Sequence, residues 1–153
     1  MIKLNGEVIK IDSFPDGTIL MKQGLTNTLG THISWKYESD RELVALIYLV
    51  KHLQSKGVSR ISLYMPYIPN ARMDRTPSDS EVFTLKYFCD IINYLKYNGV
   101  YVLDAHSSVS IALINNCRNV SPKQLIEFVK NDINFDNKSD CIFFPDEGSC
   151  KRY

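Results

Sequence analysis

Short apolar runs alternate with amphipathic segments along most of this chain, and this alternation constrains the fold more than any other feature. Residues 40–56 and 80–97 carry apolar side chains at helical spacing, which predicts two helices. The apolar runs predict strands at Thr31–Trp35, Arg60–Met65, Val100–Leu103 and Cys141–Phe144. Strands that alternate with helices predict an α/β fold, with an open, mostly parallel sheet, helices on both faces and right-handed crossovers.

Turn residues locate the smaller elements. Asn5-Gly6 suits a tight primed turn, so a hairpin is expected at the N-terminus. The capping box Ser39-Asp40-Arg41-Glu42 should open the first long helix, and Gly57 should close it. The remaining expected elements are a turn at Phe14–Gly17, a strand at Ile19–Met21, and helices at Val109–Asn116 and from Ser121-Pro122 to Lys130.

The composition predicts an ordinary globular protein. At 153 residues the chain fits a single domain spanning 1–153, and its net charge of +1 gives no general attraction to nucleic acid or to acidic membranes. The four cysteines show no metal-binding spacing, so they are expected to be reduced thiols of a cytoplasmic protein. No apolar run approaches the length that would span a membrane.

The segment Tyr64–Arg75 is the most informative motif. A short apolar strand runs into Pro66 and Pro69, which predicts a rigid, non-helical connection. Arg72, Asp74 and Arg75 follow, and a guanidinium group matches phosphate oxygens in a bidentate fashion. The alternative is a solvated loop whose Arg–Asp pair contributes little.

Further polar residues follow two other predicted strands. Asp104 and His106 come after Val100–Leu103, and Asp146 comes after Cys141–Phe144. Ligands of parallel sheets bind beyond the carboxyl ends of the strands, so these residues and Arg72 are expected to share one rim. Carboxylates and an arginine there suit a nucleotide with its Mg²⁺. Structural roles remain open: Asp104 and Asp146 could begin helices, and His106 could be a hydrogen-bonded structural residue.

Four motifs, in order along the chain, resemble those of ribose-phosphate pyrophosphokinases, the synthetases of phosphoribosyl pyrophosphate. Pro66–Arg75 is similar to the family's Pro-Tyr-x-x-Tyr-Ala-Arg-Gln-Asp-Arg/Lys segment, and Phe14–Gly17 is similar to its Phe-x-Asp-Gly-Glu. Val102–His106 resembles the Asp-Leu-His strand end, and Phe144–Gly148 resembles Ser-Pro-Asp-x-Gly-Gly. The resemblance covers nearly the whole chain, as the N-terminal half of such an enzyme.

The resemblance implies a phosphoribosyltransferase-like fold and a transfer of the β,γ-pyrophosphoryl group of ATP to the anomeric hydroxyl of ribose 5-phosphate. It implies that Arg72 and Asp74 bind ATP and that His106 and Asp146 contact Mg²⁺. It also implies a homo-oligomer, in which Phe14 and Asp16 serve the adenine pocket of a neighbouring subunit. For Phe14, a buried packing role beside the turn is the alternative.

The chain departs from the family pattern at several positions. Thr18 stands where the family has Glu, Met73 replaces Gln, and Ser149 replaces the second glycine of the last motif. Residues 107–111 lack the family's Gln and Gly-Phe-Phe. These changes are compatible with a larger ribose-phosphate acceptor such as ADP-ribose. They are also compatible with a non-catalytic regulatory or scaffolding relative, and a generic nucleotide-binding domain is a third interpretation.

The family's second half carries a mobile Lys/Arg loop and a Thr/Gly-rich loop that holds the ribose 5-phosphate, and neither pattern occurs in these 153 residues. Removing groups that stabilise charge on the transferred phosphoryl commonly costs orders of magnitude in rate. We therefore expect that this segment alone does not catalyse the reaction.

Overall fold

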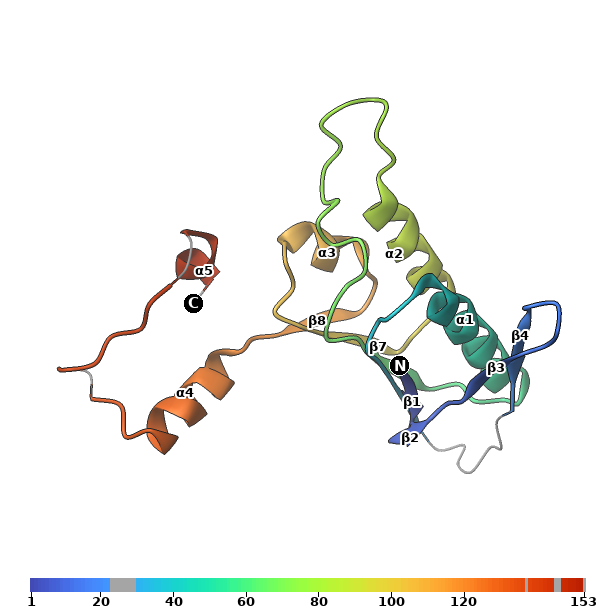
Figure 1. The fold of residues 1–153 in the computed structure, drawn as a ribbon, viewed down its shortest axis with the longest axis horizontal. Coiled ribbons are helices and arrows are strands. Elements are labelled where there is room, and N and C mark those ends of the chain that lie inside the picture. The colour runs from blue at the N-terminus through green and yellow to red at the C-terminus, as the bar shows by residue number, and fades with distance from the viewer. Residues whose placement is uncertain (23–29, 137, 145–146, 153) are drawn as a thin grey trace. The chain divides into compact units, whose positions relative to one another are not determined.

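A computed structural model describes residues 1–22, 30–136, 138–144 and 147–152 (Figure 1). The chain divides into two compact units, Met1–Val120 and Ser121–Tyr153. The strands, all in the first unit, are β1 (Ile2–Leu4), β2 (Glu7–Val8), β3 (Ile11–Ser13), β4 (Ile19–Met21), β5 (Thr31–Trp35), β6 (Ile61–Tyr64), β7 (Gly99–Leu103) and β8 (Cys117–Val120). The helices are α1 (Asp40–Ser55), α2 (Thr84–Tyr94), α3 (Ser108–Leu113), α4 (Lys123–Asp132) and α5 (Glu147–Arg152).

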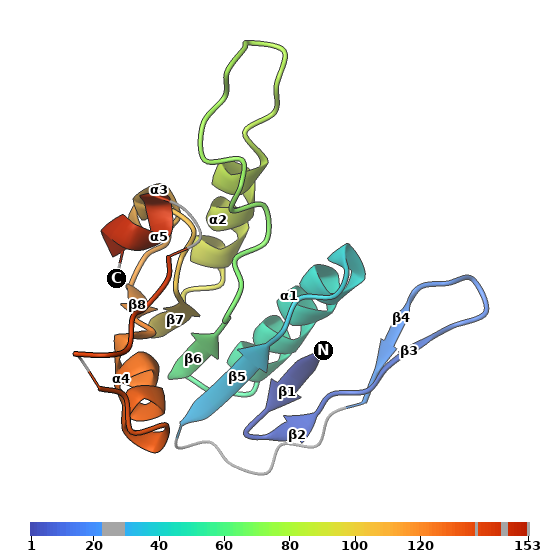
Figure 2. The same cartoon turned by 60° about the vertical axis from the view of Figure 1, so that its left-hand side comes forward.

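The first unit is built on a six-stranded sheet in the order β2-β1-β5-β6-β7-β8 (Figure 2). The pairs β5–β6, β6–β7 and β7–β8 are parallel, whereas β1 runs antiparallel to both β2 and β5. The helices α1, α2 and α3 make the three crossovers between the parallel strands. The predicted α/β fold with an open, mostly parallel sheet is therefore confirmed.

The three helices of this unit pack on one face of the sheet, whereas helices on both faces were expected. Trp35 of β5 donates its indole N–H to Glu42 of α1, and its ring lies 6.2 Å from the ring of Phe88 in α2. The Asn93 side chain of α2 bonds the backbone of α3 at Leu113. Alternate strand residues point to this face and are fully buried there, among them Ile2, Ile33, Leu63, Val100 and Val102.

Two hairpins precede the first crossover; the sequence predicted the first of them, and the turn and second strand of the other. Asn5 and Gly6 adopt φ values of 49° and 92° and connect β1 to β2, as a type I′ turn requires. The second hairpin pairs β3 with β4 as a separate two-stranded sheet, and its turn holds Phe14–Gly17. The guanidinium of Arg41 in α1 anchors this hairpin by donating to the carbonyl oxygen of Asp12 at 2.7 Å.

The helix α1 begins as expected, but its capping box is not formed. Ser39 is the N-cap residue in an extended conformation and makes no side-chain capping bond. The Glu42 carboxylate turns to Trp35 and to the backbone N–H of Glu38, because the buried indole N–H needs an acceptor. The C-terminal end matches the prediction, since Gly57 has φ 84° and donates its N–H to Gln54.

Several other element predictions were wrong in part. The second long helix is shorter than expected and ends at Tyr94, because Lys96 takes a left-handed φ of 55°. Strand β8 was missed, since Cys-Arg-Asn-Val lacks an apolar pattern and is held by parallel pairing with β7. The apolar run Val100–Leu103 does form a strand as predicted, within β7, but its last residue, Leu103, is 37% exposed.

In the second unit, residues 141–144 form no strand, contrary to the expectation from their apolar side chains. The helix α4 begins at Lys123, whose N–H is accepted by the Ser121 hydroxyl at 3.2 Å. A turn centred on Asp136 follows, in which its carboxylate accepts from the Lys138 N–H and the Ser139 hydroxyl. Among the described residues, no helix is long and apolar enough to cross a membrane.

Candidate functional site

The carboxyl ends of β6, β7 and β8 form a continuous edge of the sheet. The backbone N–H of Met65 donates to the Tyr101 carbonyl at 2.8 Å, which ties the end of β6 to β7. The Asp104 N–H donates to Val120 at 3.1 Å, and the Ala105 N–H donates to the Asn119 side-chain oxygen at 3.0 Å. The two segments that carry the predicted site residues, 66–75 and 104–107, therefore leave from neighbouring strand ends.

The loop after β6 is held by its apolar side chains. Ile68 and Ala71 are buried at 3% exposure, and the N–H of Ala71 bonds the Ile68 carbonyl at 3.2 Å to close a turn. Asn70 supplies the left-handed φ of 61° that this turn uses. Arg72 follows directly and is exposed, and its guanidinium makes no ion pair or hydrogen bond with any described residue. The backbone of this loop is thus held in place, and the loop carries at the sheet edge a guanidinium group without a partner among the described residues.

Asp74 lies two residues further along this loop. Its carboxylate is half-buried and forms no ion pair with Arg72 or Arg75. The alternative of an Arg–Asp pair in a solvated loop is therefore not what the structure contains.

The segment after β7 places His106 at the surface. Asp104 has a left-handed φ of 46°, Ala105 is buried at 7% exposure, and His106 is exposed. The helix α3 begins only at Ser108, with Ser107 as its N-cap, so Asp104 does not begin that helix. The hydroxyl oxygen of Ser107 is buried and has no hydrogen-bond partner among the described residues.

Phe14 and Asp16 lie elsewhere, in the turn of the β3–β4 hairpin. The Phe14 side chain is 48% exposed, so it does not have the buried packing role beside the turn that was the alternative prediction. Asp16 Oδ1 accepts hydrogen bonds from the Thr18 hydroxyl at 2.7 Å and from the Thr18 N–H at 2.9 Å. The bond from the Thr18 side chain, followed by that from its backbone, holds the pKa of the Asp16 carboxyl below its ordinary value.

The predicted metal site is not assembled by the described residues. Asp146 lies outside them, and no strand precedes it. Within the described ranges, no three His, Cys, Asp or Glu side chains lie close enough together to hold a metal ion. The described residues by themselves therefore do not form a site that would hold Mg²⁺.

The sequence patterns do not reveal a series of three aromatic rings that ends at this edge. Trp35 is fully buried, and its ring centroid lies 5.8 Å from that of Tyr37. The Tyr37 ring in turn lies 6.4 Å from that of Tyr67, which is 54% exposed. The position of Tyr67 directly after Pro66, in the same motif as Arg72, was the available signal.

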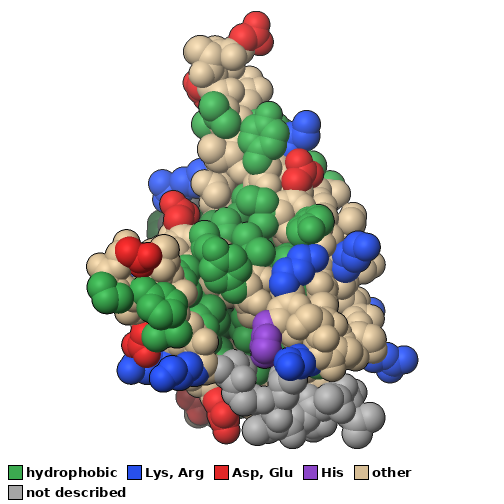
Figure 3. Space-filling view, turned by 90° about the vertical axis from the view of Figure 1, so that its right-hand side faces the viewer, with side chains coloured by type: hydrophobic (Ala, Val, Ile, Leu, Met, Phe, Trp, Pro, Cys, Tyr) green, Lys and Arg blue, Asp and Glu red, His purple; other side chains and the backbone are tan. Residues whose placement is uncertain are grey.

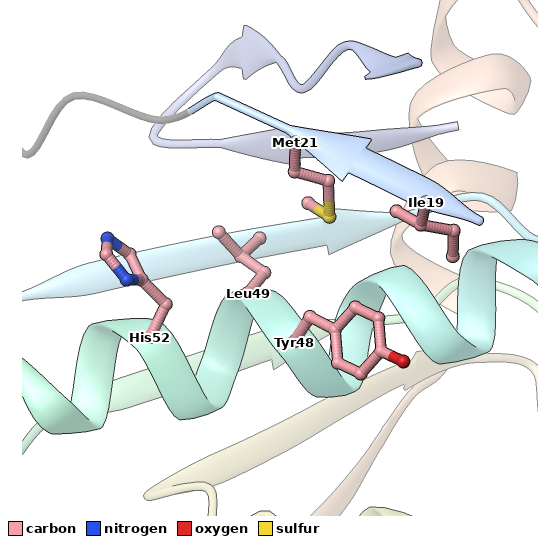
Figure 4. Close-up of a pocket in the computed structure, with 5 residues that line it drawn as sticks. All are labelled: Ile19, Met21, Tyr48, Leu49 and His52. Carbon is pink, nitrogen blue, oxygen red and sulfur yellow. The ribbon is translucent and has the colours of Figure 1, made fainter. Parts of the chain in front are cut away.

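A hollow lies away from this edge, between β4 and α1 (Figure 4). Ile19 and Met21 extend from β4 toward Tyr48 and Leu49 of α1, and His52 stands beside them. Figure 3 shows hydrophobic side chains gathered on the face of the molecule that carries these elements. The lining offers one imidazole and one phenol to a ligand, so we place the candidate site at the sheet edge, where the charged groups lie.

Comparisons with known proteins bear on the family. No family model matches the chain. It is 22% identical over 147 residues to the ribose-phosphate pyrophosphokinase of Pyrococcus furiosus, covering 94% of this chain and 51% of that protein. It is 23% identical to the ribose-phosphate pyrophosphokinase of Saccharolobus solfataricus, covering 76% of this chain and 39% of that protein.

The resemblance to the ribose-phosphate pyrophosphokinases is confirmed. The fold agrees as well: the crystal structure of phosphoribosylpyrophosphate synthetase from Mycobacterium smegmatis matches with a TM-score of 0.66 and 14% identity. That match covers 81% of this chain and 43% of the synthetase chain, and it shows a phosphoribosyltransferase-like fold. The chain spans about half the length of the curated pyrophosphokinases it matches.

Proposed function

We propose that this chain is the nucleotide-binding part of a ribose-phosphate pyrophosphokinase-type enzyme of nucleotide or NAD biosynthesis. The reaction would form a bond from the anomeric oxygen of a ribose phosphate to the β-phosphorus of ATP. It would break the bond between the β-phosphorus and the oxygen that bridges it to the α-phosphate, so AMP would leave with that oxygen and the hydroxyl proton would be released. The acceptor would be ribose 5-phosphate or a larger ribose phosphate such as ADP-ribose.

The observation that carries this proposal is the state of Arg72. Its guanidinium is exposed and has no partner among the described residues, while Ile68 and Ala71 fix the backbone that carries it. Only the side chain of such a cation has to be ordered when it binds a polyphosphate, because its backbone is already held, and its fork matches two oxygens at once. Asp74 and His106 lie in the two segments that follow the strand ends at this edge. Their side chains would therefore lie at the border of the phosphate site.

We propose that Mg²⁺ binds together with the triphosphate of ATP and not as an ion held by the protein alone. The phosphate oxygens and water molecules would supply most of its ligands, which is usual for this ion in nucleotide sites. His106 is exposed at the rim and would contact the metal or its water shell. Asp146 remains a proposed ligand.

The β3–β4 hairpin supports the proposal that the nucleotide site is shared between neighbouring copies in an oligomer. Phe14 is 48% exposed at the turn, and Figure 2 shows the hairpin standing apart from the six-stranded sheet. We propose that Phe14 and Asp16 contact the nucleotide held by a neighbouring copy.

A non-catalytic regulatory or scaffolding role is the second candidate, and one observation favours it. Thr18, which stands at the Glu position of the motif, occupies Asp16 Oδ1 with two hydrogen bonds. A carboxylate engaged in this way offers less to a ligand. Nucleotide binding without any acceptor-dependent turnover in the full-length protein would support this role.

Calorimetric titration with Mg-ATP tests nucleotide binding. We expect Arg72→Ala to weaken binding about 10-fold or more, because a charge-assisted bidentate contact contributes about 1.5–3 kcal/mol. Arg60→Ala is the matched control, since Arg60 is an exposed arginine just before the amino end of β6. His106→Ala pairs with His52→Ala, an exposed histidine on α1. Equal affinity for Mg-ATP in Arg72→Ala and Arg60→Ala would overturn the assignment.

Release of AMP tests the reaction. The protein at its full natural length is incubated with Mg-ATP and either ribose 5-phosphate or ADP-ribose. Acceptor-dependent AMP formation supports the enzyme and identifies the acceptor, whereas its absence with both acceptors favours the scaffolding role.

A further inference from the structure

We propose that Tyr67 is the surface on which the purine base of the bound nucleotide stacks. This inference rests on the proposed function, because it concerns the base of the same nucleotide whose phosphates Arg72 would hold. It assigns a base contact to this chain's own nucleotide site, separate from the contact that Phe14 of a neighbouring copy would make.

The Tyr67 ring is backed by fixed aromatic side chains on one side and open on the other. Its centroid lies 6.4 Å from the Tyr37 ring, with the two planes inclined at 43°, yet Tyr67 is 54% exposed. Tyr37 is held by its hydroxyl, which donates to Asp40 at 2.8 Å, and by the Trp35 ring at 5.8 Å. Trp35 is fully buried and bonded to Glu42. The series therefore runs from the core to an exposed aromatic surface.

The loop geometry places Tyr67 and Arg72 on either side of one turn. The Ala71 N–H bonds the Ile68 carbonyl at 3.2 Å, so residues 68–71 reverse the chain and Tyr67 and Arg72 flank the reversal. Pro66 and Pro69 restrict the backbone on either side of Tyr67. An aromatic surface and a cation carried by one rigid loop can serve the base and the phosphates of a single nucleotide.

Two other exposed tyrosines, both on α2, are worse placed for this role. Tyr94 of α2 is 64% exposed, but the Lys51 ammonium already lies 4.1 Å from its ring centroid. Tyr87, 55% exposed, lies two turns earlier on α2 rather than on the loop that carries Arg72. Stacking on a ring that is already ordered costs little conformational entropy, which favours Tyr67.

The test compares ATP with inorganic tripolyphosphate, both with Mg²⁺, because only ATP has a base. Stacking on an aromatic side chain predicts that Tyr67→Ala weakens ATP binding about 5- to 150-fold. Its affinity for tripolyphosphate should stay unchanged, whereas Arg72→Ala should weaken both ligands. Tyr67→Phe should keep the affinity for ATP, and Tyr87→Ala is the control for loss of an exposed tyrosine.

Each outcome has one meaning. If the unaltered chain binds tripolyphosphate and ATP equally well, or if Tyr67→Ala lowers both affinities together, the stacking role is overturned and the phosphate site stands. If the unaltered chain binds neither ligand, the proposed function itself is overturned. Thermal unfolding of each variant identifies a loss of fold, in which case Tyr67→Leu, which keeps an apolar contact with Tyr37, replaces Tyr67→Ala.

Discussion

The indole N–H of Trp35 donates a hydrogen bond of 3.0 Å to Glu42 Oε2 inside the protein. The same carboxylate accepts from the Glu38 N–H at 2.9 Å, and its other oxygen pairs with the terminal ammonium of Met1. Burial alone would raise the pKa of Glu42, but the bonds from the terminal ammonium, from Trp35 and from Glu38 outweigh it and lower the pKa. This pair joins β5 to α1 beneath the aromatic series that ends at Tyr67.

Acidification should therefore destabilise the protein through Glu42. A carboxyl whose pKa is lower in the folded state stabilises the fold above its unfolded pKa, and this stabilisation is lost as the pH falls through the folded value. Glu42→Gln keeps an acceptor for Trp35 but loses the charge, so we expect the free energy of unfolding at pH 7 to fall by about 1–2 kcal/mol. Urea unfolding at pH 7 and below pH 4 checks both statements. An unchanged difference between Glu42→Gln and the unaltered protein across this pH range would contradict them.

Gly57 should resist substitution because of its backbone conformation. Its φ of 84° is strained for a residue with a Cβ, although no atom stands within 4 Å of the space a Cβ would take. We expect Gly57→Ala to lower the free energy of unfolding by about 1 kcal/mol. Gly30→Ala is the control, since it also has open space around it but no positive φ. Equal thermal stabilities of the two variants would show that the conformation at Gly57 carries no cost.

The four thiols should differ in reactivity. Burial, followed by the nearby Asp90 and Cys117, raises the pKa of Cys89 to about 12, and burial also raises the pKa of Cys117. Cys141 and Cys150 are exposed. Because the thiolate is the reactive form, a disulfide reagent at pH 8 should modify two thiols rapidly, the half-buried Cys117 more slowly, and Cys89 only on unfolding. Mass spectrometry should place the rapid modification at Cys141 and Cys150, and early modification of Cys89 would contradict the packing of α2.

The Asp16–Thr18 contact should be visible in the titration of Asp16. Thr18→Ala removes the hydroxyl donor, so the pKa of the Asp16 carboxyl should rise toward its ordinary value. Carboxyl carbon shifts measured by NMR between pH 2 and pH 6 follow this directly. Thr18→Ser, which keeps the hydroxyl, should leave the titration unchanged, and a similar rise in both variants would show that the hydroxyl is not the cause.

The elements that could be predicted were those whose own residues specify them. Asn5-Gly6, Gly57 and the apolar stripe of α1 each act locally, and the structure contains the turn, the helix end and the helix they predict. β8 could not be predicted in this way, because its polar sequence is held by pairing with β7. Residues 141–144 show the opposite error: their apolar side chains suggested a strand, but no strand pairs with them among the described residues.

In the candidate site, too, the features that local sequence patterns mark could be predicted, whereas the contacts that depend on packing could not. The loop of Arg72 and the exposed position of His106 followed from prolines and strand ends, which sequence patterns reveal. The link from Trp35 through Tyr37 to Tyr67 joins residues 32 positions apart and depends on the packing of β5 against the loop after β6. No periodicity or motif encodes such a contact.

The most direct test of the central claim is where the nucleotide binds. Mn²⁺ can replace Mg²⁺ on ATP and broadens the NMR signals of nearby amides. Mn-ATP should broaden the amide signals of residues 67–74 and 104–107, at the ends of β6 and β7, and leave those of residues 58–60, at the opposite end of β6, sharp. Broadening confined to α1 and the β3–β4 hairpin, with residues 67–74 unaffected, would contradict the account.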